Sequence, residues 1–220
     1  MTTAPFLPTY PLTANNPSET SRALGEYVSL VAPFYVDEWT NPAAASANAI
    51  KTSVASSGSA QTYSGAALNG SIGAGAISPP RNITVTTGGG TATQAPATVT
   101  VTGTDIDGNT MTETISGVNG GAATYSGSKC FASVTSLALA AGGGTSATMT
   151  FGTGTSIGLT KQAKTRAGSV NVAAEISGGS VVTNGTFTKA ATAAPNGSYT
   201  PNSAPNGSTS YAVTYELATQ

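Results

Sequence analysis

Three acidic residues, Asp105, Asp107 and Glu113, lie close together in the sequence and are the side chains best suited to acid–base chemistry. Paired carboxylates can hydrolyse glycosidic bonds, one as the acid and the other as the base or nucleophile. Asp105 and Asp107, however, belong to an Asp-Ile-Asp-Gly-Asn segment that is typical of a tight turn. Ser116 occupies the position where a calcium-binding EF-hand loop needs a glutamate. We therefore interpret the segment as a hairpin loop.

The other candidates for covalent or redox chemistry are isolated. Ser126-Gly127-Ser128-Lys129 matches the S-x-x-K pattern of serine acyl enzymes, but the companion motifs of those enzymes are missing. Cys130 is the single cysteine, and its place in an expected strand favours a buried structural thiol. The chain contains no histidine, the most frequent general base. We expect no enzymatic activity, no metal and no cofactor.

Charge is sparse and balanced along the chain. Only 8% of the 220 residues are charged, and the net charge is −1. Nucleic-acid binding normally requires a positive surface, so we expect no nucleic-acid partner. The densest positive cluster, Lys161, Lys164 and Arg166, is compatible with a solvated linker or with contact to an acidic partner. Weak charge repulsion favours a permanently assembled protein over a free, concentrated one.

The N-terminal sequence has neither the basic region nor the apolar core of a signal peptide, and no stretch is apolar enough to span a membrane. We expect assembly in the cytoplasm and no membrane partner. Residues 1–40 are expected to form an extended arm, because five prolines between positions 5 and 33 prevent a continuous helix. The arm is expected to pack either on a neighbouring subunit or back on its own domain, through its aromatic side chains. The expected interface residues are Phe6, Tyr10, Phe34, Tyr35 and Trp39.

Residues 41–160 are predicted to form a β domain. Apolar residues alternate with threonine over 82–86, 97–102 and 110–115, which is typical of half-buried strands. The second and third runs flank the loop at 105–109 and therefore predict a β-hairpin. Further strands are expected over 129–139 and 147–151, whereas the alanine-rich residues 43–50 are compatible with a short helix. The expected fold is mainly β, an antiparallel sandwich or barrel.

Residues 161–220 are predicted to form a C-terminal β segment, either a small second domain or part of the first. Strands are expected over 169–176, 181–188 and 209–217. The sequence Ala-Pro-Asn-Gly-Ser occurs twice, at 194–198 and 204–208, and predicts two similar turns. Tyr199 is expected in a short extended piece between them.

The succession of these motifs resembles a β domain of tailed-bacteriophage virion proteins. The likeness covers about residues 41–160 and is carried by turn and strand patterns, not by catalytic signatures. Its motifs are PPRNITV at 79–85, ATVTVTGTD at 97–105, DGN at 107–109, TETI at 112–115 and KCFASV at 129–134. The Pro-Asn-Gly-containing end also resembles the C-terminus of such proteins.

The resemblance implies a capsid decoration or cement protein. Such a protein is expected to be a homotrimer on the capsid surface of the virion, with the major capsid protein as its partner. One alternative is a head fibre or adhesin that binds cell-surface glycans in a groove of exposed tyrosines, such as Tyr63, Tyr125 and Tyr199. The other alternative is a neck or tail-tube component, which would form rings.

Overall fold

The computed structural model describes residues 34–166, 169–170, 172–189 and 196–217. These residues form strands and three short 3-10 helices, at Gly65–Ala67, Ala92–Gln94 and Val118–Gly120, and contain no α-helix. Every strand pairing between them is antiparallel. The prediction of a mainly β, antiparallel fold is confirmed.

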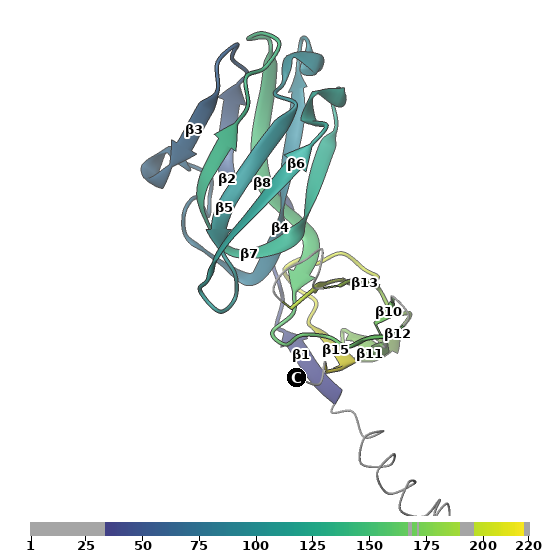
Figure 1. The fold of residues 1–220 in the computed structure, drawn as a ribbon. Helices are drawn as coiled ribbons and strands as arrows, with labels where there is room; N and C mark the ends of the chain where they lie inside the picture. Colours follow the sequence, from purple (N-terminus) through teal and green to yellow (C-terminus); the bar gives the residue numbers. More distant parts are fainter. Residues whose placement is uncertain (1–33, 167–168, 171, 190–195, 218–220) are drawn as a thin grey trace, which may run out of the picture.

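The larger sheet has nine strands and curls around the main hydrophobic core (Figure 1). Its strands are β2 (Ser46–Ala55), β3 (Gln61–Ser64), β4 (Ala76–Gly89), β5 (Thr98–Thr104), β6 (Thr110–Ser116), β7 (Thr124–Leu139), β8 (Ala147–Gly158), β13 (Thr186–Thr188) and β14 (Ser198–Thr200). The first half of β7 pairs with β4 and its second half with β5, so this long strand links two parts of the sheet. Phe131, Val134 and Leu137 of β7 are fully buried in the core.

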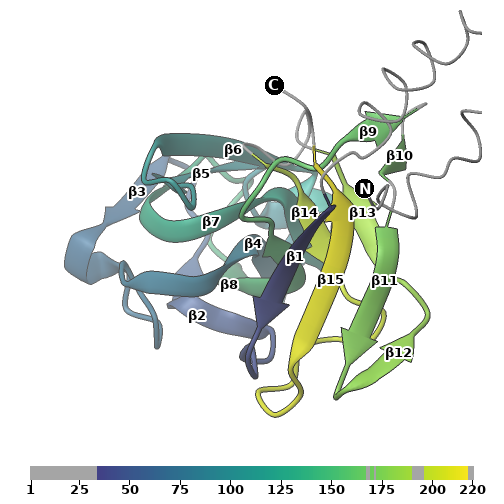
Figure 2. The same ribbon diagram turned by 90° about the horizontal axis from the view of Figure 1, so that it is seen from below.

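The smaller sheet has four strands in the order β1-β15-β11-β12, which lie side by side in Figure 2. They are β1 (Phe34–Trp39), β11 (Val172–Ser177), β12 (Ser180–Val182) and β15 (Tyr211–Glu216), and a separate pair is formed by β9 (Thr165–Arg166) and β10 (Ser169–Val170). The smaller sheet covers a second core that contains Trp39, Ile157, Tyr199 and Tyr215. Strand β8 joins the cores, because Phe151 lies in the first and Ile157 in the second.

The end of the expected N-terminal arm is a strand. Residues 34–39 form β1, an edge strand that pairs with β15, so this part of the expected arm is extended and takes the alternative of packing back on its own domain. Burial alternates along β1: Asp37 and Trp39 face the second core, whereas Phe34, Val36 and Glu38 are exposed. This period of two is that of a half-buried strand, and it packs back on its own chain. Residues 1–33 lie outside the described residues.

The alanine-rich residues 43–50 do not form the helical turns that their composition allows. Residues 46–55 are strand β2, and Ile50 and Val54 lie in the main core. The backbone of this strand is approached very closely by two glycines: a Cβ on Gly70 would lie 2.2 Å from the Ala49 carbonyl oxygen, and one on Gly152 1.7 Å from the Ser46 carbonyl oxygen. Tertiary packing therefore overrides the helical preference of alanine.

The predicted hairpin is confirmed. β5 and β6 pair in register from Thr98 opposite Ser116 to Thr104 opposite Thr110. In the loop, the Asp105 carboxylate accepts hydrogen bonds from the backbone N–H groups of Asp107 and Asn109, both at 2.9 Å. Gly108 takes the positive φ of 83° that the turn requires.

Candidate functional site

The outer side of the smaller sheet gathers the exposed apolar side chains of the described structure. Phe34, Val36, Ile176 and Val181 are the large hydrophobic residues that the described part of the chain leaves exposed, and their exposed fractions are 60, 46, 37 and 74%. In the antiparallel register, Ile176 lies opposite both Ala212 and Val181, and Val36 lies opposite Thr214. Residues opposite each other point to the same side of a sheet. We call this surface, defined by Phe34, Val36, Ile176 and Val181, the apolar face.

The inner side of the same sheet fixes the position of the edge strand β1. The Asp37 carboxylate is buried and accepts hydrogen bonds from the Tyr215 hydroxyl at 2.8 Å and from the Thr160 backbone N–H at 3.1 Å. Burial and the neighbouring Asp37 charge both raise the pKa of Tyr215, so this phenol remains a donor. β1 is thereby held to β15 and to the chain that follows β8.

Strand β11 is anchored by a second buried carboxylate. Glu175 is fully buried, and its Oε2 accepts hydrogen bonds from the Tyr199 hydroxyl and from the backbone N–H groups of Gly185 at 2.9 Å and Asn202 at 3.2 Å. Its other oxygen, Oε1, has no hydrogen-bond partner among the described residues. Burial, then the hydrogen bond to Glu175, raises the pKa of Tyr199. These bonds hold Ile176, the next residue of β11, in the apolar face.

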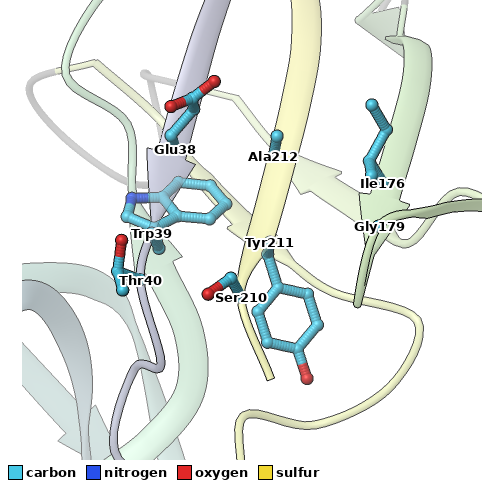
Figure 3. A pocket seen from close by; sticks show the side chains of 8 residues that line it. All are labelled: Glu38, Trp39, Thr40, Ile176, Gly179, Ser210, Tyr211 and Ala212. Atoms are coloured by element: carbon cyan, nitrogen blue, oxygen red, sulfur yellow. The ribbon is translucent and has the colours of Figure 1, made fainter. Parts of the chain in front are cut away.

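A small hollow of about 150 Å³ lies at one end of the apolar face (Figure 3). Its lining comes from β1, β15 and β11 and from adjoining turns, and consists of Glu38, Trp39, Thr40, Ile176, Gly179, Ser210, Tyr211 and Ala212. Sites for small-molecule ligands usually measure about 300–1,000 Å³. This hollow is therefore of a size to receive one side chain of a partner and is too small for a cofactor.

The five expected interface residues have different places. Phe34 belongs to the apolar face, whereas Tyr35 is half-buried with its ring 6.0 Å from that of Tyr215. Trp39 is only 6% exposed and stacks on Tyr199 at 6.4 Å, so it is a residue of the second core. Phe6 and Tyr10 lie outside the described residues.

Sequence reasoning missed Val36, Ile176 and Val181. Val36 was detectable from the alternation in Phe34-Tyr35-Val36-Asp37-Glu38-Trp39. Ile176 and Val181 lie in expected strands, but only the pairing of β11 with β15 and of β12 with β11 shows which side of the sheet they share.

The candidate catalytic carboxylates Asp105 and Glu113 accept hydrogen bonds from backbone N–H groups. Asp105 caps the hairpin loop, and Glu113 accepts hydrogen bonds from the backbone N–H groups of Ser128 at 2.7 Å and Lys129 at 3.2 Å. Cys130 is buried as expected, and burial raises the pKa of its thiol to about 12. Among the described residues, no cluster of three His, Cys, Asp or Glu side chains is arranged to hold a metal ion. No helix in the described ranges is long and apolar enough to cross a membrane.

The tyrosines expected in a glycan-binding groove do not come together. Tyr199 is fully buried. The Lys51 ammonium lies 4.5 Å from the centroid of the Tyr63 ring, and Tyr63 pairs with the second half of β7. Tyr125 is near the start of β7 and donates a hydrogen bond to the Gly121 carbonyl at 3.2 Å. That form of the adhesin hypothesis is wrong for these three residues.

One residue of the basic cluster is already paired. Lys164 forms a 2.7 Å ion pair with Glu216, at the end of β15. Lys164 therefore helps to hold β15, which lies between β1 and β11 in the smaller sheet.

Comparison with protein-family models, with curated protein sequences and with solved structures found no match to this chain.

Proposed function

We propose that this chain is a structural protein of a tailed-bacteriophage virion, a homotrimeric decoration protein that binds the outer surface of the major capsid lattice. The observation that carries the proposal is the apolar face: four exposed large hydrophobic residues share one side of a four-stranded sheet. Exposed apolar side chains gathered on one surface mark protein–protein contact sites. The kind of particle, a tailed-bacteriophage virion, is inferred from the sequence resemblance.

The size of the apolar face indicates how much of an interface it can provide. Three strands of six residues and one of three, about 4.8 Å apart and at about 3.3 Å per residue, cover about 330 Å². A stable interface buries about 800 Å² on each partner. The remainder must come from other residues, and residues 1–33, which continue directly from Phe34 and contain Phe6 and Tyr10, are the adjoining source.

The proposed stabilisation of the capsid involves binding alone and no chemical reaction. A decoration protein that contacts two neighbouring capsid subunits adds buried apolar area across their junction, at about 25 cal/mol for each Å². Rupture of the shell under internal DNA pressure then requires this additional area to be exposed. A chain with only 8% charged residues makes contacts that depend little on salt.

Cosedimentation with capsids that lack this protein tests the proposal. The triple variant Phe34→Ser, Val36→Thr and Val181→Thr removes three apolar contacts and keeps residues compatible with strands. We expect the wild type to bind and to raise the rupture temperature of the capsids, and the variant to bind at least about tenfold more weakly.

A matched control carries three mild changes at exposed positions of the larger sheet: Thr62→Ser, Thr112→Ser and Ala138→Ser. It should bind like the wild type. Absence of wild-type binding to capsids, or a triple variant that binds as well as the control, would contradict the proposal. Light scattering measures the mass of the assembly in solution and so tests the proposed trimer. Rings that bind necks or tails would instead favour the tail-component alternative.

A further inference from the structure

A second hollow, with a volume of about 360 Å³, lies on the larger sheet among β4, β7, β8 and the residues that lead into β2. Eight of its eleven lining residues carry a hydroxyl or an amide side chain, and none is charged. We call it the hydroxyl groove, defined by its hydroxyl-bearing strand residues Thr84, Thr86, Thr124, Ser126, Thr153 and Thr155. It shares no lining residue with the apolar face.

Two hydroxyls of the groove lack a hydrogen-bond partner among the described residues. Thr84 is 6% exposed and Thr153 is 5% exposed, yet neither side chain makes a hydrogen bond within the described part of the chain. Neither oxygen is among the fully buried side-chain atoms that lack a partner, so both hydroxyls face the open groove. Thr84 and Thr153 therefore retain a donor and an acceptor each for a molecule in the groove.

The floor of the groove is held rigidly. The Asn82 amide donates to the Gly127 carbonyl and accepts from the Ser156 N–H, both at 3.0 Å, and so ties β4 to β7 and β8. Beneath it, the buried Arg81 donates from Nε to the Gly154 carbonyl at 3.0 Å and from Nη1 to the Ala43 carbonyl at 2.8 Å, which fixes the wall that precedes β2. A site formed in advance loses little entropy on binding.

The lining determines the class of ligand. Because no charged side chain lines the groove, an ionic ligand would lose hydration without gaining a counter-charge. Serine and threonine hydroxyls both donate and accept, as sugar hydroxyls do, and the threonine methyl groups with Ala45 and Ala47 offer apolar contact to the C–H groups of a sugar ring. We propose that the hydroxyl groove binds an uncharged carbohydrate.

The affinity for one sugar is expected to be weak. No aromatic ring lines the groove, so the contacts are hydrogen bonds and small apolar surfaces, which for a ligand of this size correspond to a Kd on the order of 1 mM. If the chain decorates a capsid as proposed above, many copies on one particle strengthen the attachment to a polysaccharide by multivalency.

Amide NMR titration of the full chain with the methyl glycosides of glucose, galactose and mannose tests the proposal. We expect at least one of them to shift the amide signals of residues in the hydroxyl groove, with saturation near 10 mM for a Kd of about 1 mM. Glucuronic acid, which carries a charge, should bind more weakly than glucose.

Thr84→Val is the diagnostic variant, with Thr112→Val on an exposed position of β6 as its matched control. Thr84→Val should weaken sugar binding about fivefold, the factor for one net hydrogen bond, while its unfolding temperature stays at or above that of the wild type. The proposal is overturned if no glycoside shifts the groove amides, if Thr84→Val binds as the wild type does, or if glucuronic acid binds more tightly than glucose. None of these results depends on capsid binding, which the proposed function places on the apolar face.

Discussion

The buried carboxylate of Glu175 acts on three different segments at once. Its Oε2 accepts hydrogen bonds from Tyr199, from the loop at Gly185 and from the turn at Asn202, while its backbone N–H donates to the Asn184 amide oxygen at 2.8 Å. A single side chain thus connects the smaller sheet to the aromatic residues of the second core. The second oxygen of the carboxylate has no hydrogen-bond partner among the described residues.

Glu175→Ala is expected to reduce the free energy of unfolding by about 3 kcal/mol. The change leaves the Tyr199 hydroxyl and the Asn202 N–H without their acceptor, at about 1–3 kcal/mol for each buried group, whereas the Gly185 N–H retains the Tyr199 hydroxyl oxygen as an acceptor. Part of the loss is offset because a buried carboxylate is removed. Chemical denaturation measures the difference. Glu38→Ala, at an exposed position of the same sheet, is the control and should change stability by less than about 0.5 kcal/mol. Equal stability of the two variants would show that the Glu175 contacts are unimportant.

At the scale of strands, the larger sheet depends on the close approach of β2 and β8. Ser46 lies opposite Thr153 in the register, and the register shifts before the next pair, Lys51 opposite Phe151. Gly152 is next to this irregular crossing, where its lack of a side chain admits the Ser46 carbonyl. The position therefore demands glycine for reasons of space.

Gly152→Ala is expected to destabilise the protein by about 2 kcal/mol or more. The added methyl group would lie 1.7 Å from the Ser46 carbonyl oxygen, so the backbone of β2 must move. Gly90→Ala is a suitable control, because nothing lies within 4 Å of a Cβ at that position. The denaturation midpoints of the two variants can be compared directly, and a stable Gly152→Ala protein would mean that β2 and β8 are less tightly packed than described.

These elements also show what the sequence could predict. The β5–β6 hairpin was predictable because its signals are local: a short period-two run on each side of Asp-Gly-Asn. β2 was not, because its strand conformation depends on Gly70 and Gly152, which lie far along the chain. The apolar face was partly predictable, since Phe34 stood among the expected contacts. Val36 was detectable from the alternation within residues 34–39, whereas the places of Ile176 and Val181 depend on the pairing of β11 with β15 and with β12.

At the scale of the whole molecule, the chain has two cores joined by β8, and the second needs both ends of the sequence. Trp39 from β1 packs with Tyr199 and Tyr215 from the C-terminal part. β1 thus completes the smaller sheet and also supplies Phe34 and Val36 to the apolar face. The six residues of β1 therefore contribute both to the second core and to the proposed contact surface.

Two N-terminal deletions separate these roles. Deletion of residues 1–33 should leave the unfolding transition cooperative but reduce capsid binding, because the proposed interface then retains less than half of the required area. Deletion of residues 1–40 also removes Asp37 and Trp39 and should cost at least about 3 kcal/mol of stability. Far-UV circular dichroism with denaturant measures the stability of both deletion variants, and cosedimentation measures their capsid binding. If both deletions are equally stable, β1 is not part of the second core, and full capsid binding without residues 1–33 would remove them from the proposed interface.

The pairing of β1 with β15 has a consequence for the time course of synthesis. Asp37 and Tyr215, which are hydrogen-bonded to each other, are 178 positions apart, so β1 has no strand partner until β15 has left the ribosome. Contacts between residues so distant in sequence form late and slowly, whereas the β5–β6 hairpin can form as soon as it emerges. The apolar face therefore forms late, and a nascent chain cannot present it before β15 has been synthesised.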